Sequence, residues 1–298
     1  RVIAKPNGGK ASALNRGLAQ TTSEYIVTID ADTMVLPDTI SRLVAPLGDP
    51  QIDAVCGNIR VGNARNWLTR FQAVEYITGQ NFDRRGFDPM NAIFVVPGAT
   101  GAWRRSRVLK VGGYSDQTLT EDADLTFSLL ADGARITYAP DAIALTEAPE
   151  TVGTLFTQRF RWGYGAYQCL WKHRRSFFKG SLGWITLPNM LLVQVLLPLI
   201  SPVIDLTLIA ALVTGNLMAV LPWLGFMVAI DLLASVLAFV LDRAPLRLLW
   251  LLIPQRFSYR YFMYALTAKY LIAIMRGRRH GWNKLERRNS VAELAAAK

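Results

Sequence analysis

The sequence has few of the residues that build disulfide frameworks or metal clusters. Its 298 residues include two cysteines, Cys56 and Cys169, and two histidines. The cysteines lie far apart and have no recognisable metal-ligand spacing, which excludes a disulfide scaffold and a cysteine-based metal module. We therefore predict two ordinary thiols in a reducing compartment.

One long stretch contains no basic residue, although the whole chain is basic. The formal net charge is +11, yet residues 181–241 contain no Lys or Arg and only two acids, Asp205 and Asp231. Because a helix needs about 20 apolar residues to cross the hydrocarbon layer, the stretch predicts two spans, near Pro188–Val213 and Leu217–Leu241. A buried helix of a soluble protein would show polar positions every third or fourth residue, and these are missing here.

Basic residues flank this apolar stretch on both sides. They are Lys172-His173-Arg174-Arg175 before it and Arg276-Gly277-Arg278-Arg279 after it. The positive-inside rule places both flanks in the cytoplasm, so the number of crossings between them should be even. Leu246–Met275, broken at Pro254, is then interfacial or re-entrant; alternatively, it is one span paired with an extra split of the apolar stretch.

Residues 1–150 alternate short β-rich runs with helix-like stretches, which is typical of a sheet built from strand–crossover–strand units. The predicted strands are Tyr25–Ile29, Ala54–Cys56, Ala92–Val96 and Arg135–Tyr138. The predicted helices are Lys10–Ala19, Thr39–Ala45, Trp67–Asn81 and Asp122–Ala131. Residues 151–180 mix aromatic and cationic side chains, which suits a helix in the headgroup layer. A nucleic-acid surface is disfavoured because no RNA- or DNA-binding module accompanies them.

The first candidate site is Asp30-Ala31-Asp32, which follows the clearest predicted strand. Ligands of open α/β sheets bind outside the carboxyl ends of the strands. Two carboxylates one residue apart can both reach a hard divalent cation, and Mg²⁺ typically fills its other positions with phosphate and water oxygens. The implied ligand is a metal–diphosphate. Taken alone, the motif is also typical of a solvated acidic turn.

The second candidate is Thr120-Glu121-Asp122, at the start of a predicted amphipathic helix. The positive end of the helix dipole stabilises acids at this position, so capping alone can explain them. The functional interpretation is a general base, because a carboxylate near an acceptor hydroxyl can remove its proton during attack.

The third candidate is Gln158-Arg159-Phe160-Arg161-Trp162, which places an amide, two guanidiniums and an indole within one and a half helical turns. Arginine forks match diphosphate oxygens, and a flat aromatic face suits the apolar face of a sugar ring. An interfacial anchor uses the same residue types, and both interpretations can hold at once.

With these motifs in this order ahead of a membrane block, the sequence resembles the membrane-integrated family 2 glycosyltransferases. These are the processive β-glycan synthases of the cellulose, chitin, hyaluronan and poly-N-acetylglucosamine type. Lys5-Pro6-Asn7-Gly8-Gly9-Lys10 is similar to a further family motif, and residues 98–105 look like the family's acceptor-side loop. Pro149-Glu150-Thr151 looks especially like the poly-N-acetylglucosamine synthases. The family's first nucleoside-binding strands would precede Lys5, so we expect an N-terminally truncated chain.

The resemblance implies the fold class and its division along the chain. We expect an α/β fold of the GT-A type, partial because of the missing strands, over residues 1–150. Interfacial helices over 151–180, an α-helical transmembrane region over 181–276 and a basic cytoplasmic tail over 277–298 should follow.

The resemblance also implies an activity and its residues. The expected reaction is inverting transfer of a sugar, most closely N-acetylglucosamine, from a UDP-sugar to a growing β-linked polysaccharide, at the cytoplasmic face of a bacterial-type inner membrane and coupled to export. Asp122, with Glu121 beside it, is the expected catalytic base, and Asp32 ranks above Asp30 as ligand for Mg²⁺ or Mn²⁺. The expected substrate contacts are Asp30, Gln158, Arg159, Arg161, Trp162, Lys10 and Gly98. The expected partners are the UDP-sugar donor, the glycan acceptor, the lipid bilayer and accessory export subunits, with no nucleic acid.

Three alternatives stay open. The first is non-processive transfer to a lipid or oligosaccharide acceptor. The second is a membrane transporter with Asp205 and Asp231 in its path, since intramembrane ionisable residues are functional candidates; a transporter, however, has no use for the three motifs. The third is a non-catalytic glycan- or nucleotide-binding relic.

Overall fold

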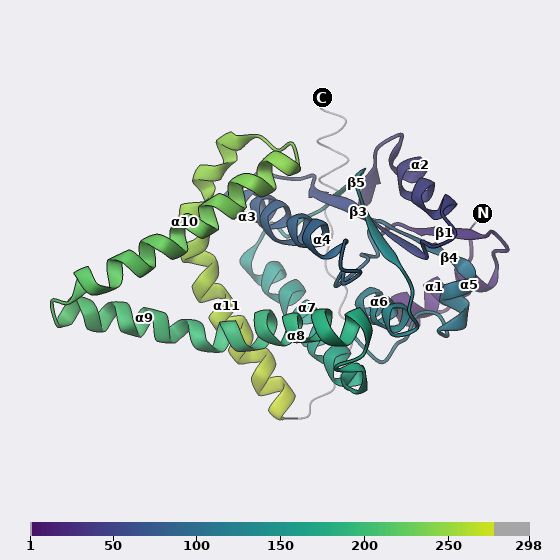
Figure 1. The fold of residues 1–298 in the computed structure, drawn as a ribbon. Coiled ribbons are helices and arrows are strands. Elements are labelled where there is room, and N and C mark those ends of the chain that lie inside the picture. Colours follow the sequence, from purple (N-terminus) through teal and green to yellow (C-terminus); the bar gives the residue numbers. More distant parts are fainter. Residues whose placement is uncertain (1, 277–298) are drawn as a thin grey trace.

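The computed structural model describes residues 2–276, which form a mixed sheet flanked by helices and a long helical hairpin that projects from it (Figure 1). The described part contains a five-stranded sheet in the order β1-β4-β3-β5-β2. β3 and β5 are parallel, whereas β1–β4, β3–β4 and β2–β5 are antiparallel. The expected strand–crossover–strand unit therefore accounts for one of these four pairings. The strands are β1 (Tyr25–Thr28), β2 (Thr33–Val35), β3 (Ala54–Val61), β4 (Gly101–Arg104) and β5 (Ile136–Thr146).

Helices cover both faces of the sheet. On one face, side chains such as Cys56 and Trp103 pack with residues of α1, α6 and α7; on the other, Val55 and Ala102 pack against α2. This alternation is the period-two pattern of a sheet buried on both sides. The helices of this part are α1 (Gly9–Ala19), α2 (Thr39–Val44), α3 (Trp67–Glu75), α4 (Phe82–Phe87), α5 (Arg105–Lys110), α6 (Glu121–Ala131) and α7 (Val152–Lys172). A π-helical segment, Tyr76–Asn81, joins α3 to α4.

Both cysteines are free and buried, in agreement with the prediction of ordinary thiols. Burial raises the pKa of Cys56 to about 11 and that of Cys169 to about 12. Because the thiolate is the reactive form, both residues are chemically quiet near neutral pH.

Most of the predicted elements are confirmed, and one strand is wrong. The runs beginning at Tyr25, Ala54 and Arg135 are strands, and the four predicted helices form near their expected bounds. Residues 92–96, predicted as a strand, have no regular structure. Their backbone N–H groups bond elsewhere, as Val96 N–H donates to Thr126 Oγ1 at 3.0 Å and Ala92 N–H to the Phe87 carbonyl at 3.0 Å. The apolar character of this run reflects burial in the core, and the strand that follows it is β4.

The two predicted spans form a hairpin of two long helices, which meet at the turn and diverge toward the sheet domain (Figure 1). A continuous helical run, Leu182–Val213, contains α8 (Leu187–Met190) and α9 (Leu197–Val213), and α10 (Leu217–Leu241) returns from the turn. Both runs are long and apolar enough to cross a membrane, and little of either is buried against the rest of the chain.

Both ends of the hairpin are attached to the sheet domain. At the entry, Leu182, Leu187 and Met190 are buried in the largest hydrophobic core cluster, so the first turns of the predicted transmembrane region belong to that core. At the exit, Asp242 is 2% exposed and accepts a hydrogen bond from Asn58 Nδ2 at 2.8 Å. The hairpin therefore leaves and re-enters the same side of the molecule.

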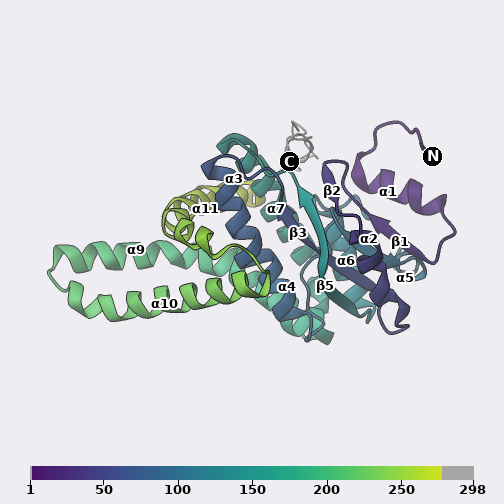
Figure 2. The same cartoon turned by 90° about the horizontal axis from the view of Figure 1, so that it is seen from above.

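A further helix, α11 (Leu252–Met275), crosses the base of the hairpin (Figures 1 and 2). Arg256 forms a two-bond ion pair with Asp231 of α10, at 2.9 and 2.8 Å. Arg260 lies 2.8 Å from Asp205 of α9, which also accepts a hydrogen bond from the Tyr264 hydroxyl at 2.8 Å. Both acids of the apolar stretch are thus paired with arginines of α11. This pairing gives them a structural role and weakens the transporter alternative.

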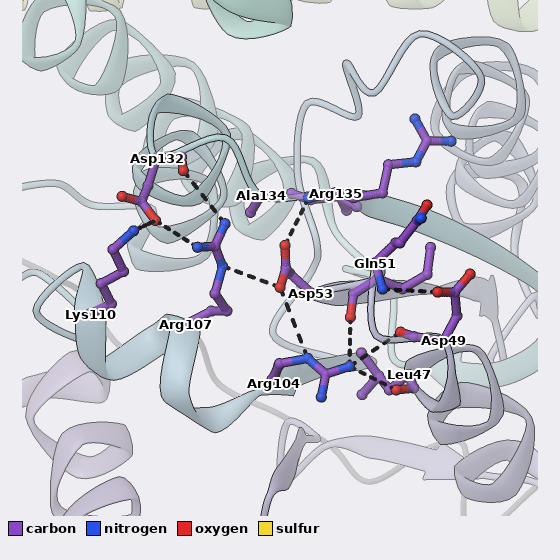
Figure 3. Close-up of polar contacts among 12 residues, drawn as sticks. Leu47, Asp49, Gln51, Asp53, Arg104, Arg107, Lys110, Asp132, Ala134 and Arg135 are labelled. Atoms are coloured by element: carbon purple, nitrogen blue, oxygen red, sulfur yellow. Dashed lines mark hydrogen bonds and ion pairs between the residues drawn. The ribbon is translucent and has the colours of Figure 1, made fainter.

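A polar network joins the end of β4 to the segments just before β3 and β5 (Figure 3). Arg104, the last residue of β4, donates to the carbonyl oxygens of Leu47, Asp49 and Ile52 at 2.9 to 3.2 Å. Asp53 accepts a hydrogen bond from the backbone N–H of Arg135 at 3.0 Å and so ties the start of β3 to the start of β5. The network holds this end of the strands in register. The expected basic tail, residues 277–298, lies outside the described residues.

Candidate active site

Hydrogen bonds at its start and along its length fix the helix α1, which carries Lys10. Its entry is a turn in which the Asn7 side chain accepts a hydrogen bond from the Gly9 backbone N–H at 3.2 Å. Gly9 has φ +80°, a left-handed conformation that glycine adopts without steric cost. Further along α1, Asn15 exchanges two hydrogen bonds with the backbone of Tyr114, at 2.7 and 2.9 Å. The position of Lys10 in the first turn is therefore set from both sides.

The register of β1 and β4 brings two further predicted residues, Asp30 and Gly98, to the same end of these strands. Thr28, the last residue of β1, pairs with Gly101, the first residue of β4. Because the strands are antiparallel, Asp30 just after β1 and Gly98 just before β4 lie at the same end. Asp30 opens a tight turn, in which its carbonyl accepts a hydrogen bond from the Thr33 backbone N–H at 3.0 Å.

Lys10 connects two of the three predicted motifs. Its ammonium lies 2.6 Å from Asp30 Oδ1 and 3.0 Å from Glu121 Oε1. Burial alone would lower the pKa of Lys10, but the carboxylates of Glu121, Asp30 and Asp122 outweigh it and raise that pKa above the usual range. Burial, together with the nearby charge of Asp122, raises the pKa of Glu121 even though Lys10 opposes this. The site therefore holds a permanent cation between acids that crowd one another.

Gly98 connects the third acid to this group. Its backbone N–H donates to Asp122 Oδ2 at 3.1 Å, and the Ala123 N–H donates to Asp122 Oδ1 at 2.9 Å. A Cβ at position 98 would lie 2.5 Å from the Lys10 ammonium, so a larger residue there would displace that ammonium from its position. Each carboxylate oxygen has two lone-pair sites. One site on each oxygen of Asp122 is engaged, and the orientation of the carboxylate is fixed.

Asp32 lies in the turn after β1, partly exposed and with polar interactions of its own. Within residues 2–276, His, Cys, Asp and Glu side chains do not gather in any group of three or more that could hold a metal ion. Among these described residues, the Asp30-Ala31-Asp32 turn offers a divalent cation two carboxylates. This donor set suits an ion that takes its remaining oxygens from phosphate and water.

The Gln158-to-Trp162 motif lies on α7 and contacts α3 and the segment after it. Arg159 is buried, and its Nη2 donates to Glu75 Oε2 at 2.8 Å. Burial alone would lower the pKa of Arg159, but the Glu75 carboxylate raises it, so the guanidinium stays charged. The same guanidinium lies 4.2 Å from the centre of the Trp162 ring. Arg159 is thus committed to Glu75 and Trp162, while Arg161 is partly exposed and interacts with its own neighbours.

Two residues of this motif bear on the site: Trp162 links α7 to the loop that carries Gly98, and Gln158 has a buried side-chain oxygen without a partner. Trp162 packs against a small apolar cluster that contains Ala99, the residue next to Gly98. Gln158 is 4% exposed, and its Oε1 is buried without a hydrogen-bond partner among residues 2–276. Buried polar atoms are nearly always hydrogen-bonded, so this oxygen is a natural contact for a bound molecule.

The structure adds residues that the sequence analysis did not select. Glu75 is the partner of Arg159, and Asp124 is fully buried between Lys172 and His173, at 2.6 and 2.7 Å. Burial alone would raise the pKa of Asp124, but hydrogen bonds from His173 and Lys172 hold it below the usual range. Glu75 stands on a predicted helix away from any motif, and Asp124 lies two residues after the Thr120-Glu121-Asp122 motif without being part of it. Only their long-range partners, more than 45 positions away in the sequence, reveal them.

A family model and two named relatives match this chain. The family model described as "Glycosyl transferase family group 2" matches residues 25–275, more than four fifths of the chain. The chain is 34% identical over 173 residues to the poly-beta-1,6-N-acetyl-D-glucosamine synthase of Staphylococcus aureus, covering 58% of this chain and 41% of that protein. It is 32% identical over 165 residues to the Staphylococcus epidermidis enzyme of the same name, covering 55% and 40%. The chain thus spans about two fifths of the length of these relatives.

A solved structure has the same fold. It is a mannosyltransferase from Pyrobaculum calidifontis in complex with GDP-Man and Mn²⁺. The similarity covers 91% of this chain and 68% of that one, with a TM-score of 0.57 and 21% sequence identity. The expected GT-A-type α/β fold followed by helices is confirmed.

Proposed function

Because this chain belongs to glycosyl transferase family group 2, we propose that the full-length protein transfers N-acetylglucosamine from its UDP-activated form to the end of a growing β-linked polysaccharide. The choice of sugar is supported by the relatives in Staphylococcus, which are named poly-beta-1,6-N-acetyl-D-glucosamine synthases. The reaction inverts the anomeric carbon and takes place at the cytoplasmic face of the membrane.

One observation carries this proposal: the Asp30-Ala31-Asp32 and Thr120-Glu121-Asp122 motifs, which lie far apart in the sequence, meet around Lys10 and Gly98. Lys10 pairs with Asp30 and Glu121, and Gly98 binds Asp122. A sugar transferase needs a cationic side for the departing diphosphate and a base for the acceptor within one site. Lys10 supplies the positive charge and Asp122 the carboxylate. Asp30 lies just beyond the end of β1, where ligands of other open α/β sheets bind.

Asp122 is the base in this proposal. The acceptor hydroxyl attacks the anomeric carbon, a new carbon–oxygen bond forms, the bond to the UDP oxygen breaks, and the proton passes to Asp122. The backbone N–H groups of Gly98 and Ala123 hold the carboxylate while leaving one lone-pair site on each oxygen. Asp124 is unsuited to this task, because its carboxylate is buried between Lys172 and His173.

The donor side is built from Lys10 and α7. Lys10 supplies a permanent positive charge near the place where the diphosphate charge grows, and Arg161 adds a second cation. Gln158 offers its unpaired Oε1 to a hydroxyl or N–H of the substrate. Trp162 supports the terminal sugar of the acceptor with its apolar face, a common use of aromatic rings. Arg159 positions Trp162, because its guanidinium is held by Glu75 and lies over the Trp162 ring.

Asp32, with Asp30 beside it, would hold a Mg²⁺ or Mn²⁺ ion. The two carboxylates fit such an ion, which prefers oxygen ligands and accepts phosphate and water oxygens in its other positions. Mn²⁺ accompanies GDP-Man in the similar mannosyltransferase structure. When bound, the ion would neutralise charge on the leaving diphosphate.

The hairpin supports a location of the reaction at a membrane. Its two helices are the candidate spans, and both of its ends attach to the sheet domain. Two crossings therefore return the chain to one side, which fits the basic residues before the hairpin and a cytoplasmic active site. A synthase embedded in this way could pass its glycan outward, with or without accessory export subunits.

The test is a panel of radiolabelled UDP-sugars offered to membranes that contain the full-length protein. We expect label from UDP-N-acetylglucosamine, and little from UDP-glucose or UDP-glucuronic acid, in a product of high molecular mass. Preference for UDP-glucose would refute the donor assignment, and label confined to lipid or short oligosaccharide would favour the non-processive alternative. Absence of transfer from every donor would refute the enzymatic function.

A further inference from the structure

The second half of α7 packs closely against the start of α6, the helix that carries Asp122. A Cβ at Gly165 would lie 2.7 Å from both Thr120 Cγ2 and Thr120 Oγ1, and 3.1 Å from the Thr120 backbone nitrogen. Carbon atoms do not approach other atoms this closely without displacement, so glycine is required for the two segments to touch. One turn further along α7, Gln168 Oε1 accepts a hydrogen bond from the Leu119 backbone N–H at 2.9 Å. The backbone leading into α6 is therefore held by α7.

Two polar side-chain contacts close the same interface from the side of α6. Lys172 Nζ lies 2.6 Å from Asp124 Oδ2, and His173 Nε2 lies 2.7 Å from Asp124 Oδ1. The Asp124 side chain is 1% exposed, so water has little access to its carboxylate. The first turn of α6 is thus fixed on both flanks of Asp122, at Leu119 and Thr120 before it and at Asp124 after it.

These contacts share a face of α7 with the sugar-binding motif. Positions 158, 162, 165, 169 and 172 follow the three- and four-residue spacing of one helical stripe. Trp162 and Gly165 are one turn apart on that stripe, so a rigid helix separates the residue proposed to support the acceptor sugar from the residue that touches Thr120. The distance between Trp162 and the Asp122 carboxylate is then set by how closely α7 and Thr120 pack.

We infer that Gly165 is a positioning residue for the transfer reaction. Because Gly165 has no side chain, α7 packs directly against Thr120, and Asp122 then lies within reach of the acceptor hydroxyl held over Trp162. Gln168 fixes the same contact through its hydrogen bond with the Leu119 backbone. This inference rests on the proposed function, because it assigns the geometry to the base and acceptor of that reaction. A displacement of about 1 Å between reacting groups can cost about 10²-fold in rate.

The test compares Gly165→Ala with Gly153→Ala in membranes containing the full-length protein. Gly153 lies on the same helix, and a Cβ there would meet no atom within 4 Å, so it is the matched control. Alanine is a better helix former than glycine by about 1 kcal/mol, hence neither change should weaken α7 itself. We expect Gly165→Ala to lower kcat about 10-fold or more with the KM for the UDP-sugar within about twofold, and Gly153→Ala to leave both unchanged.

A second substitution, which removes the clash between the added Cβ and the Thr120 side chain, gives the decisive comparison. Thr120→Ala removes the two atoms that lie 2.7 Å from the added Cβ. The double variant Gly165→Ala, Thr120→Ala should therefore recover most of the rate of Thr120→Ala alone, because only the 3.1 Å contact with the Thr120 backbone nitrogen remains. Unchanged kcat in Gly165→Ala, or a double variant as slow as Gly165→Ala, would overturn the inference.

A second pair of variants adds no atom at the contact between Gly165 and Thr120. Gln168→Leu removes the acceptor of the Leu119 N–H, whereas Gln168→Glu retains an oxygen at that position. We expect a fall in kcat for the leucine variant and rescue by the glutamate variant; equal rates in the two would contradict the inference. Wild-type protein without any sugar transfer would refute the proposed function and the inference together, whereas active wild type with an equally active Gly165→Ala refutes only the inference.

Discussion

Lys10 is the cation on which the candidate site depends, and its replacement by methionine gives a sharp prediction. Lys10→Met keeps the length of the side chain and removes its charge. The ammonium lies 2.6 Å from Asp30 and 3.0 Å from Glu121, with Glu121 10% and Asp30 34% exposed. Unit charges 4 Å apart interact by about 4 kcal/mol at an effective dielectric constant of about 20. Solvent screening reduces the share of the more exposed Asp30 to about 1 kcal/mol or less.

We therefore expect Lys10→Met to lower the free energy of unfolding by about 2 kcal/mol at pH 8, a fall in Tm of about 4–8 °C for a chain of this size. The effect should shrink toward pH 5. The pKa of Glu121 is raised in the folded protein, so folding takes up a proton on this group, and stability falls as pH rises from its unfolded to its folded pKa. Without Lys10 that folded pKa rises further, and the destabilised window extends to higher pH.

The assay is thermal unfolding of the detergent-solubilised full-length protein at pH 5 and pH 8. Lys5→Met is the matched control, because the Lys5 ammonium donates to the exposed Pro6 carbonyl at 2.7 Å. The control should change Tm by less than about 1 °C at both pH values. Equal Tm for Lys10→Met and Lys5→Met, or a loss that is larger at pH 5 than at pH 8, would refute the ionic account of the site.

Two further predictions concern the metal and the hairpin. Asp32→Asn should abolish most turnover and raise the Mn²⁺ concentration needed for half-maximal activity about 10-fold or more, because a carboxylate ligand is lost; full activity of the wild type in excess chelator would exclude the metal role. Arg256→Leu should lower Tm and the yield of folded protein, because it leaves Asp231 charged without its partner. The double variant Arg256→Leu, Asp231→Leu should restore both quantities, and a double variant as unstable as the single one would show that the ion pair is unimportant.

Local signals in the sequence predicted the parts of this fold that depend on neighbouring residues. The run that begins at Tyr25 forms a strand, and the apolar stretch without basic residues forms the hairpin. The run at 92–96 misled because a short buried segment and a short strand have the same composition. The strand β2 (Thr33–Val35) was missed because it has three residues and depends on pairing with β5 for its definition.

The candidate site was predictable as a set of motifs, but its internal pairing was not. Asp30 and Asp122 were selected because each follows a strand or begins a helix. That Lys10 pairs with Asp30 and Glu121, or that Arg159 is committed to Glu75, depends on contacts between distant segments. Such contacts follow from the tertiary packing of α1, α3 and α7, which no local pattern records.

The measurement that tests the central claim most directly is the turnover of Asp122→Asn in full-length protein, beside its affinity for the UDP-sugar. Asparagine keeps one oxygen to accept the N–H of Gly98 or Ala123 and remains a good residue at a helix start, but its amide cannot take the acceptor's proton. If Asp122 is the base, turnover falls about 10²-fold or more while UDP-sugar affinity and Tm stay near those of the wild type. Near-normal turnover in Asp122→Asn would contradict the account, because the residue would then serve only to cap α6.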